Sequence, residues 1–150
     1  MKIVYFIIFF FVQITFSQSN KEIDLIVVIN DEVVTNLQNL KLIINSDKDG
    51  SIISPLYHPG SLVLTSKQYE VLISDTTKSI ELSFAYIGKE KSTNYKMIYG
   101  KKWLEERFAI LKIYDLNKKK YKKMYEPITP ESGFGASIDF GYYSILNVKQ

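Results

Sequence analysis

Hydrophobic and polar residues alternate one by one along several stretches of this chain. The clearest stretch is SIELSFAYI at residues 79–87, where every second residue is large and apolar. Alternation is also present within residues 37–44, 69–74 and 95–99, whereas residues 23–29 are an apolar run with Asp24 as the only charge, which also predicts a strand. A period of two residues is typical of a β-strand with one buried face, so each run is predicted to be a strand.

Turn-forming residues separate these runs at the spacing of about 8–12 residues that sandwich domains show, which gives about eight or nine strands. The pattern predicts an all-β fold, an antiparallel two-sheet β-sandwich of the general immunoglobulin or transthyretin type, with a small β-barrel as the alternative. Only residues 101–107 have helical spacing, so we expect at most one short helix. Without longer helices to form crossovers, parallel strand pairing is not expected.

Residues 107–126 are predicted to form a hairpin around which the fold is organised. In the first half, RFAILKIY, residues 108–114 are apolar on both faces apart from Lys112, as a central strand is. The following DLNK has the side chains of a turn. The second half, KKYKKMYE, is predicted to be a lysine-covered strand at the outside of the sheet.

Residues 1–17 are predicted to be a signal peptide. Lys2 precedes an unbroken apolar run over residues 3–12, and Thr-Phe-Ser at 15–17 places small residues where a signal peptidase requires them. Cleavage there leaves a single β-sandwich domain over residues 18–150. An uncleaved anchor is the alternative, but the apolar run is shorter than the ~20 residues that span a bilayer.

The composition narrows the class of protein. Of 150 residues, 46% are hydrophobic and none is cysteine, so the domain needs an apolar core without disulfides, thiolate metal sites or a lipoprotein anchor. The net charge of +3 is too small for a dedicated nucleic-acid-binding domain. We expect a secreted, periplasmic or cell-surface protein with no cofactor, no nucleic-acid partner and no transmembrane segment once the leader is removed.

The lysine cluster is the first candidate site. On an extended strand, alternate lysines and tyrosines would share one face and could bind an anionic envelope polymer or glycan. The alternative is that the lysines protect an exposed strand edge from aggregation. The candidate ligand-binding residues are Lys119, Lys120, Tyr121, Lys122, Lys123 and Tyr125.

Residues 45–50, NSDKDG, match the first half of a calcium-binding loop. Asn45, Asp47 and Asp49 would supply the oxygen ligands. The twelfth position of such a loop should be a bidentate glutamate but is Leu56, so an ordinary Asp-Gly hairpin turn is the alternative.

Catalytic residues are harder to assign. His58 is the only histidine and lies in a turn-like Tyr-His-Pro-Gly sequence, and no nucleophile-elbow motif accompanies it. Glu105 and Glu106 are adjacent, so they would point to opposite sides of a strand. Trp103, the single tryptophan, is expected in the core rather than in a sugar-stacking platform.

These observations favour an exported, non-enzymatic β-sandwich module with a structural or binding role in the cell envelope or outside the cell. The first alternative is a binder of an anionic polymer through the lysines, and another envelope protein is also a possible partner. The second alternative is a small carboxylate-based hydrolase.

Overall fold

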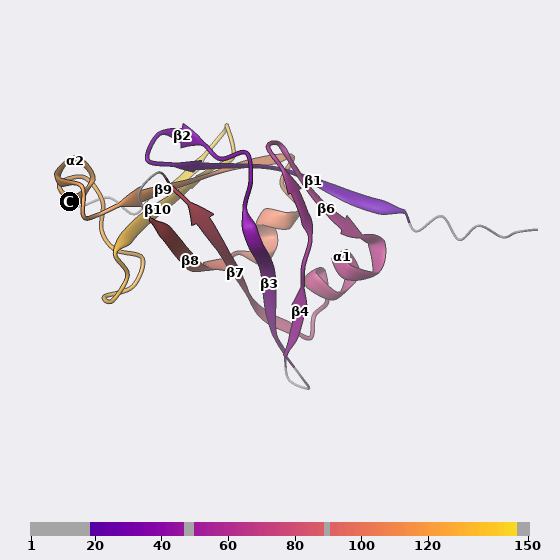
Figure 1. The fold of residues 1–150 in the computed structure, drawn as a ribbon. Coiled ribbons are helices and arrows are strands. Elements are labelled where there is room, and N and C mark those ends of the chain that lie inside the picture. Colours follow the sequence, from indigo (N-terminus) through magenta and orange to yellow (C-terminus); the bar gives the residue numbers. More distant parts are fainter. Residues whose placement is uncertain (1–18, 47–49, 89–90, 147–150) are drawn as a thin grey trace, which may run out of the picture.

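The computed structural model describes residues 19–46, 50–88 and 91–146, so the predicted leader lies outside the described residues. Two β-sheets form the described part of the chain (Figure 1). The seven-stranded sheet has the order β11-β10-β9-β1-β6-β5, with β2 also paired to β1, and the four-stranded sheet has the order β4-β3-β7-β8. The predicted all-β, two-sheet architecture is confirmed, and the closed-barrel alternative is wrong.

The seven-stranded sheet consists of β1 (Asn20–Ile29), β2 (Glu32–Val33), β5 (Leu56–His58), β6 (Ser61–Thr65), β9 (Phe108–Asp115), β10 (Phe134–Asp139) and β11 (Ser144–Leu146). The four-stranded sheet consists of β3 (Gln38–Ser46), β4 (Ser51–Ile53), β7 (Thr77–Ile87) and β8 (Ser92–Tyr99). Two α-helices, α1 (Ser66–Ile73) and α2 (Lys119–Lys122), and one 3-10 helix, η1 (Lys101–Leu104), complete the described elements.

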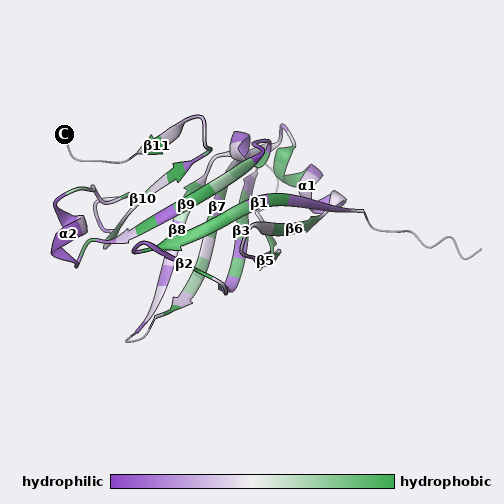
Figure 2. Ribbon diagram, turned by 90° about the horizontal axis from the view of Figure 1, so that it is seen from above, coloured by the Kyte–Doolittle hydropathy of each residue, from purple (hydrophilic) through white to green (hydrophobic). Residues whose placement is uncertain are grey.

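The core lies between the sheets and follows the alternation in the sequence. On β7, Ile80, Leu82 and Phe84 are buried, and β1 contributes Leu25 and Val27 from the opposite sheet. Figure 2 shows the hydrophobic parts of β1 and β9 side by side in the middle of the larger sheet. Burial of these side chains is the main favourable contribution to folding, at roughly 1.5–3 kcal/mol for each large residue.

The pairing of β1 with β9 is parallel, which corrects the expectation of a purely antiparallel sandwich. The first residues of β1 pair with β6 in the antiparallel sense, and residues 24–29 then pair with β9. Parallel pairing is possible here without a crossover helix because the chain between β1 and β9 passes through the second sheet. That long connection replaces the helix of an ordinary crossover.

The alternation over residues 69–74 was misleading, because this segment belongs to helix α1. A capping box starts the helix. The Thr65 hydroxyl accepts a hydrogen bond from the Gln68 backbone N–H at 3.2 Å, and the Gln68 side chain accepts one from the Thr65 N–H at 2.8 Å. Such reciprocal caps satisfy backbone donors that the first helical turn leaves open.

The helical spacing near residue 101 corresponds to η1, but α1 and α2 exceed the expected single short helix. No helix within the described ranges is long and apolar enough to cross a bilayer.

The predicted hairpin over residues 107–126 is wrong in its second half. The strand β9 and the following turn form as expected, with the Asp115 carboxylate accepting from the Asn117 backbone N–H at 3.0 Å. The lysine-rich segment then forms α2 instead of a strand. The antiparallel partner of β9 is β10, which begins only at Phe134.

Candidate functional site

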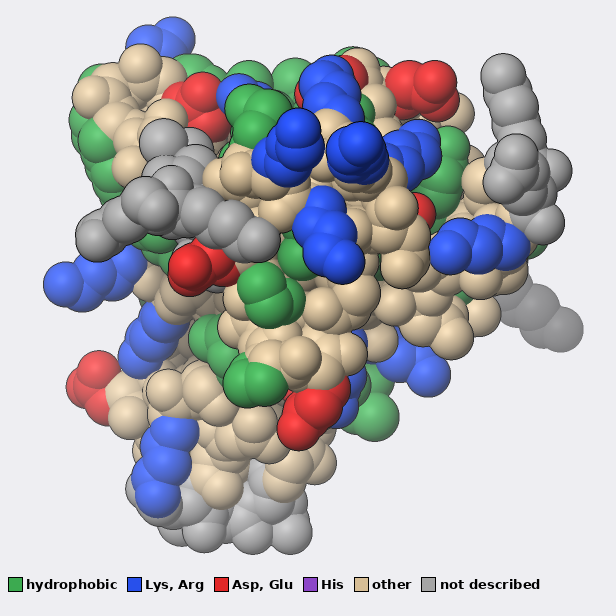
Figure 3. Space-filling view, turned by 90° about the vertical axis from the view of Figure 1, so that its left-hand side faces the viewer, with side chains coloured by type: hydrophobic (Ala, Val, Ile, Leu, Met, Phe, Trp, Pro, Cys, Tyr) green, Lys and Arg blue, Asp and Glu red, His purple; other side chains and the backbone are tan. Residues whose placement is uncertain are grey.

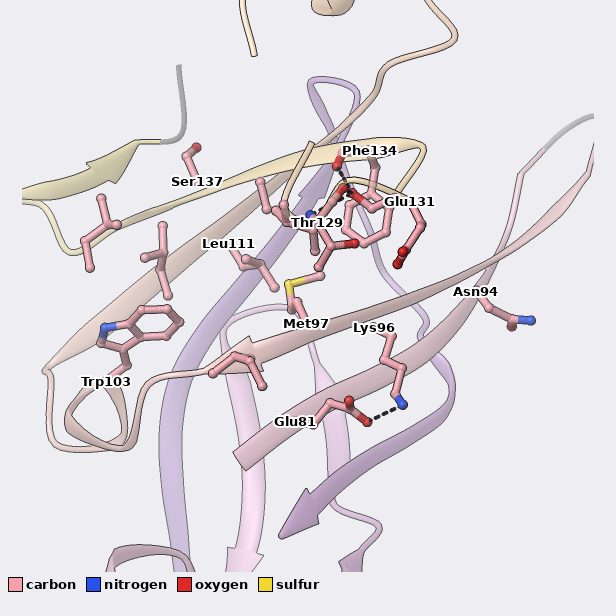
Figure 4. A pocket seen from close by; sticks show the side chains of 16 residues that line it. Glu81, Asn94, Lys96, Met97, Trp103, Leu111, Thr129, Glu131, Phe134 and Ser137 are labelled. Atoms are coloured by element: carbon pink, nitrogen blue, oxygen red, sulfur yellow. Dashed lines mark hydrogen bonds and ion pairs between the residues drawn. The ribbon is translucent and has the colours of Figure 1, made fainter. Parts of the chain in front are cut away.

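An open cleft of about 670 Å³ lies between the two sheets, where β8 faces β10 and β11 (Figure 4). Most of its lining is apolar. The lining residues are Glu81, Asn94, Lys96, Met97, Ile98, Trp103, Leu111, Ile128, Thr129, Glu131, Ser132, Phe134, Ala136, Ser137, Ile138 and Ile145.

The strand β8 forms one wall of the cleft. It pairs with β7 along its whole length, and within the described residues no strand pairs with its other edge. Met97 points from β8 toward Leu111 on the opposite sheet, whereas Ile98 is 61% exposed on the outer face. The cleft therefore borders a free strand edge of eight residues.

Aromatic rings stand at both ends of the cleft. Trp103 lies at one end, packed edge-on against Tyr99 with ring centroids 5.1 Å apart. Phe134 lies at the other end and packs against Tyr95 in the same geometry at 4.9 Å. Because core tyrosines hold both rings, the ends of the cleft are preorganised for contact with an apolar ligand.

Polar groups surround the apolar lining. Lys96 forms an ion pair with Glu81 at 3.0 Å on the outer face of the smaller sheet. Across the cleft, the Ser132 hydroxyl accepts from the Thr129 backbone N–H at 3.2 Å. It donates to the carbonyl of Thr129 or Phe134, each at 3.0 Å. This loop is therefore held in place by its own serine.

The candidate lysines lie on and beside α2, away from the cleft lining. The tyrosines of the segment have other partners. The Tyr121 ring is buried and its hydroxyl donates to the Asp31 carboxylate at 2.7 Å. Tyr125 stacks on Tyr114 with centroids 3.8 Å apart. Because α2 is helical, the expected common face of alternate lysines and tyrosines does not exist.

The electrostatics of this cluster centre on Asp31. Lys120 and Asp31 form an ion pair at 2.7 Å. The hydrogen bonds from Lys120 and then Tyr121 lower the pKa of Asp31, and the same carboxylate raises the pKa of Lys120. Burial is the main cause that raises the pKa of Tyr125 to about 12. Of the six candidate residues, Lys120, Tyr121 and Tyr125 are thus engaged within the fold.

The calcium hypothesis gains no support from the described residues. Asp47 and Asp49 lie outside them, and the Asn45 amide on β3 donates to the Ser79 hydroxyl at 3.1 Å. Where the structure describes the chain, no group of three His, Asp or Glu side chains is placed to hold a metal ion.

The residues considered for catalysis are not brought together at the cleft. His58 ends β5, and neither Glu105 nor Glu106 is part of the cleft lining. Glu106 instead accepts hydrogen bonds from the hydroxyls of Tyr142 and Tyr143, which lower its pKa. The same contact raises the pKa of Tyr142 to about 12.

Trp103, which was expected in the core, both packs on core rings and lines the cleft. No protein-family model, curated protein or solved structure matches this chain. The function therefore has to be inferred from the geometry of the cleft and of the surface.

Proposed function

We propose that this protein is an exported, non-catalytic binding module that holds an extended polypeptide segment of a partner in the cleft beside β8. One observation carries the proposal: the apolar cleft runs along a strand edge that no other described strand pairs with. The role outside the cytoplasm rests on the signal peptide predicted for residues 1–17.

An extended peptide matches both features of the site. Its backbone N–H and C=O groups would pair with the free edge of β8, as in other complexes formed by strand addition. Its side chains alternate between two sides, so every second one would enter the apolar cleft toward Met97 and Leu111. At about 3.3 Å per residue, the eight residues of β8 accommodate an occupant of about six to eight residues.

The side chains at the rim of the cleft favour an apolar peptide over a charged one. Lys96, the lysine of β8 itself, is paired with Glu81, and Glu131 lies across the cleft. Ile98 and Ile145, which are 61% and 45% exposed, extend the apolar surface to the rim. We therefore expect a segment with alternating hydrophobic residues and little net charge.

A small amphipathic ligand is the second candidate. The cleft volume of about 670 Å³ is within the range of about 300–1,000 Å³ that is usual for such ligands. This ligand would contact the apolar walls without pairing with the free edge of β8. Only the peptide would therefore form hydrogen bonds with the β8 backbone.

Selection from a random dodecapeptide display library tests the proposal. We expect captured peptides with apolar residues at alternate positions. Binding is measured through the emission of Trp103, which is the only tryptophan and lines the cleft. An unchanged Trp103 emission, or capture of peptides without alternation, would contradict the proposal.

Matched variants locate the binding. Ala136→Phe adds a ring on β10 inside the cleft and should weaken peptide capture at least tenfold. Ile52→Phe adds the same ring on β4, at the edge of the four-stranded sheet opposite β8, and should not. Circular dichroism and thermal melting confirm that both variants fold. Equal capture by both would place the binding elsewhere.

A further inference from the structure

A strongly basic surface lies at the end of the molecule that contains α2. Five of the six residues from 118 to 123 are lysines, and all five are exposed, whereas Tyr121 between them is buried. Figure 2 shows α2 as a hydrophilic element beyond the hydrophobic strands. Figure 3, which looks onto this end, shows lysine side chains gathered over its upper part.

The basic surface is built on a fixed support. Asn30 and Asp31 both have positive φ, at 53° and 71°, and form the two-residue turn between β1 and β2. The Asn30 side chain accepts from the Asp115 backbone N–H at 2.8 Å, and Asp31 binds Lys120 and Tyr121. Together with the stacked rings of Tyr125 and Tyr114, these contacts hold α2 against β9.

The lysines themselves oppose this conformation. On a helical turn, residues four apart are neighbours, so Lys119 lies near Lys123 with a like charge. Within the described part of the chain, Lys118, Lys119 and Lys123 form no ion pair. A bound anion would reduce this repulsion, so the surface favours an anionic ligand.

The shape of the surface favours a polymer over a small anion. The hollow beside α2, about 450 Å³, contains Lys91 and Lys118 but also Glu32 and Asp115, so its charges balance. Lys119 and Lys123, which form no ion pair within the described residues, lie outside this hollow on the exposed surface of the segment, where a small anion would contact few lysines at once. A chain with regularly spaced charges can contact several lysines and release several counterions.

The side chains around these lysines indicate which class of polymer the surface binds. Single-stranded nucleic acids are held on exposed aromatic platforms, but Tyr114 and Tyr121 are buried and Tyr125 is stacked. Insertion into a lipid surface needs an apolar face, and within the described segment 118–125 only Met124, which is 50% exposed, is a large exposed hydrophobic residue. Lysines, as hydrated point charges without the planar fork of arginine, suit diffuse contact with a flexible polyanion.

We infer that the α2 surface binds an acidic polysaccharide through Lys118, Lys119 and Lys123. This site is separate from the cleft and does not depend on the proposal made for it. It keeps Lys119 and Lys123 of the sequence-based hypothesis, adds Lys118, and replaces the strand face with a helical segment. It assigns Lys120 and the tyrosines to the support.

Binding to immobilised heparin and alginate at increasing salt tests the inference, because these polysaccharides carry sulfate and carboxylate groups respectively. The variant K118Q/K119Q/K123Q should lose roughly tenfold or more in affinity near 0.1 M salt, and its salt dependence should fall by about two to three counterions. The control K41Q/K67Q/K102Q removes the same charge from exposed lysines elsewhere and should bind like the parent.

Three results would overturn the inference. The first is no binding of the parent to either polysaccharide. The second is an equal loss in both triple variants, which would indicate an effect of net charge alone. The third is binding to single-stranded DNA or to phosphatidylglycerol vesicles that is as tight as binding to polysaccharide and equally sensitive to K118Q/K119Q/K123Q.

Discussion

Two tyrosine hydroxyls affect the stability of this fold in opposite directions. The Tyr99 hydroxyl is buried and has no hydrogen-bond partner among the described residues, and burial raises its pKa. The Tyr57 hydroxyl accepts from the Val27 backbone N–H at 3.0 Å and donates to the Val34 carbonyl at 3.2 Å. A buried polar group without a partner is destabilising, whereas a paired one satisfies the backbone.

Tyr99→Phe should therefore stabilise the protein by about 1 kcal/mol, because it removes an unpaired buried hydroxyl. Tyr57→Phe should destabilise it by about 1–2 kcal/mol, because it leaves the Val27 N–H and the Val34 carbonyl without that partner. Urea unfolding of both variants measures the two changes. A loss of stability in Tyr99→Phe would show that its hydroxyl is hydrogen-bonded in solution.

Asp31 gives a prediction that depends on pH. Its pKa in the folded protein lies below the ordinary value of 3.8, mainly because of its contact with Lys120. A lowered carboxylate pKa stabilises the fold above the unfolded-state pKa, and this contribution is lost as the pH falls through the folded-state value.

Asp31→Asn should lower stability at pH 7 by less than ~1 kcal/mol, since the pair is largely exposed to solvent. Asparagine also tolerates the positive φ of this turn, so the backbone is not strained. The difference from the parent should shrink as the pH falls below 3.8 through the lowered folded-state pKa, and it should vanish once Asp31 is protonated in both states. A difference that stayed constant between pH 7 and pH 2 would rule out the ion pair as its cause.

At the scale of elements, the sequence predicted strands well where one face is buried. Residues 79–87 form β7 as expected, because Ile80, Leu82 and Phe84 all face the core. Alternation was a poor guide over residues 69–74, where the capping box of Thr65 and Gln68 favours a helix. It was also a poor guide near α2, where Tyr121 and Tyr125 lie four residues apart and pack on the same ring of Tyr114.

The capping box makes α1 testable by itself. Thr65→Ala removes the acceptor for the Gln68 N–H and should cost about 1 kcal/mol, whereas Thr65→Ser keeps the hydroxyl and should cost much less. Chemical unfolding of the two variants provides the comparison. Equal losses would mean that burial of the Thr65 methyl group, and not the cap, stabilises this end of the helix.

At the scale of the whole molecule, the sequence predicted two layers and a core but could not predict where the layers remain open. The cleft joins β8 to β10 and to the loop at residues 128–132, which are distant in the sequence. Period-two patterns identify which faces are buried, not which edges lack a partner. The parallel pairing of β1 with β9 was missed for the same reason, since it depends on the path through the second sheet.

Amide hydrogen exchange of the protein, alone and with a peptide selected from the library, tests the central claim most directly. We predict slower exchange along β8 (Ser92–Tyr99) on binding, with no change along β4, the other edge of the same sheet. Peptide binding that leaves β8 exchange unchanged, or that protects both edges equally, would contradict strand addition at the cleft.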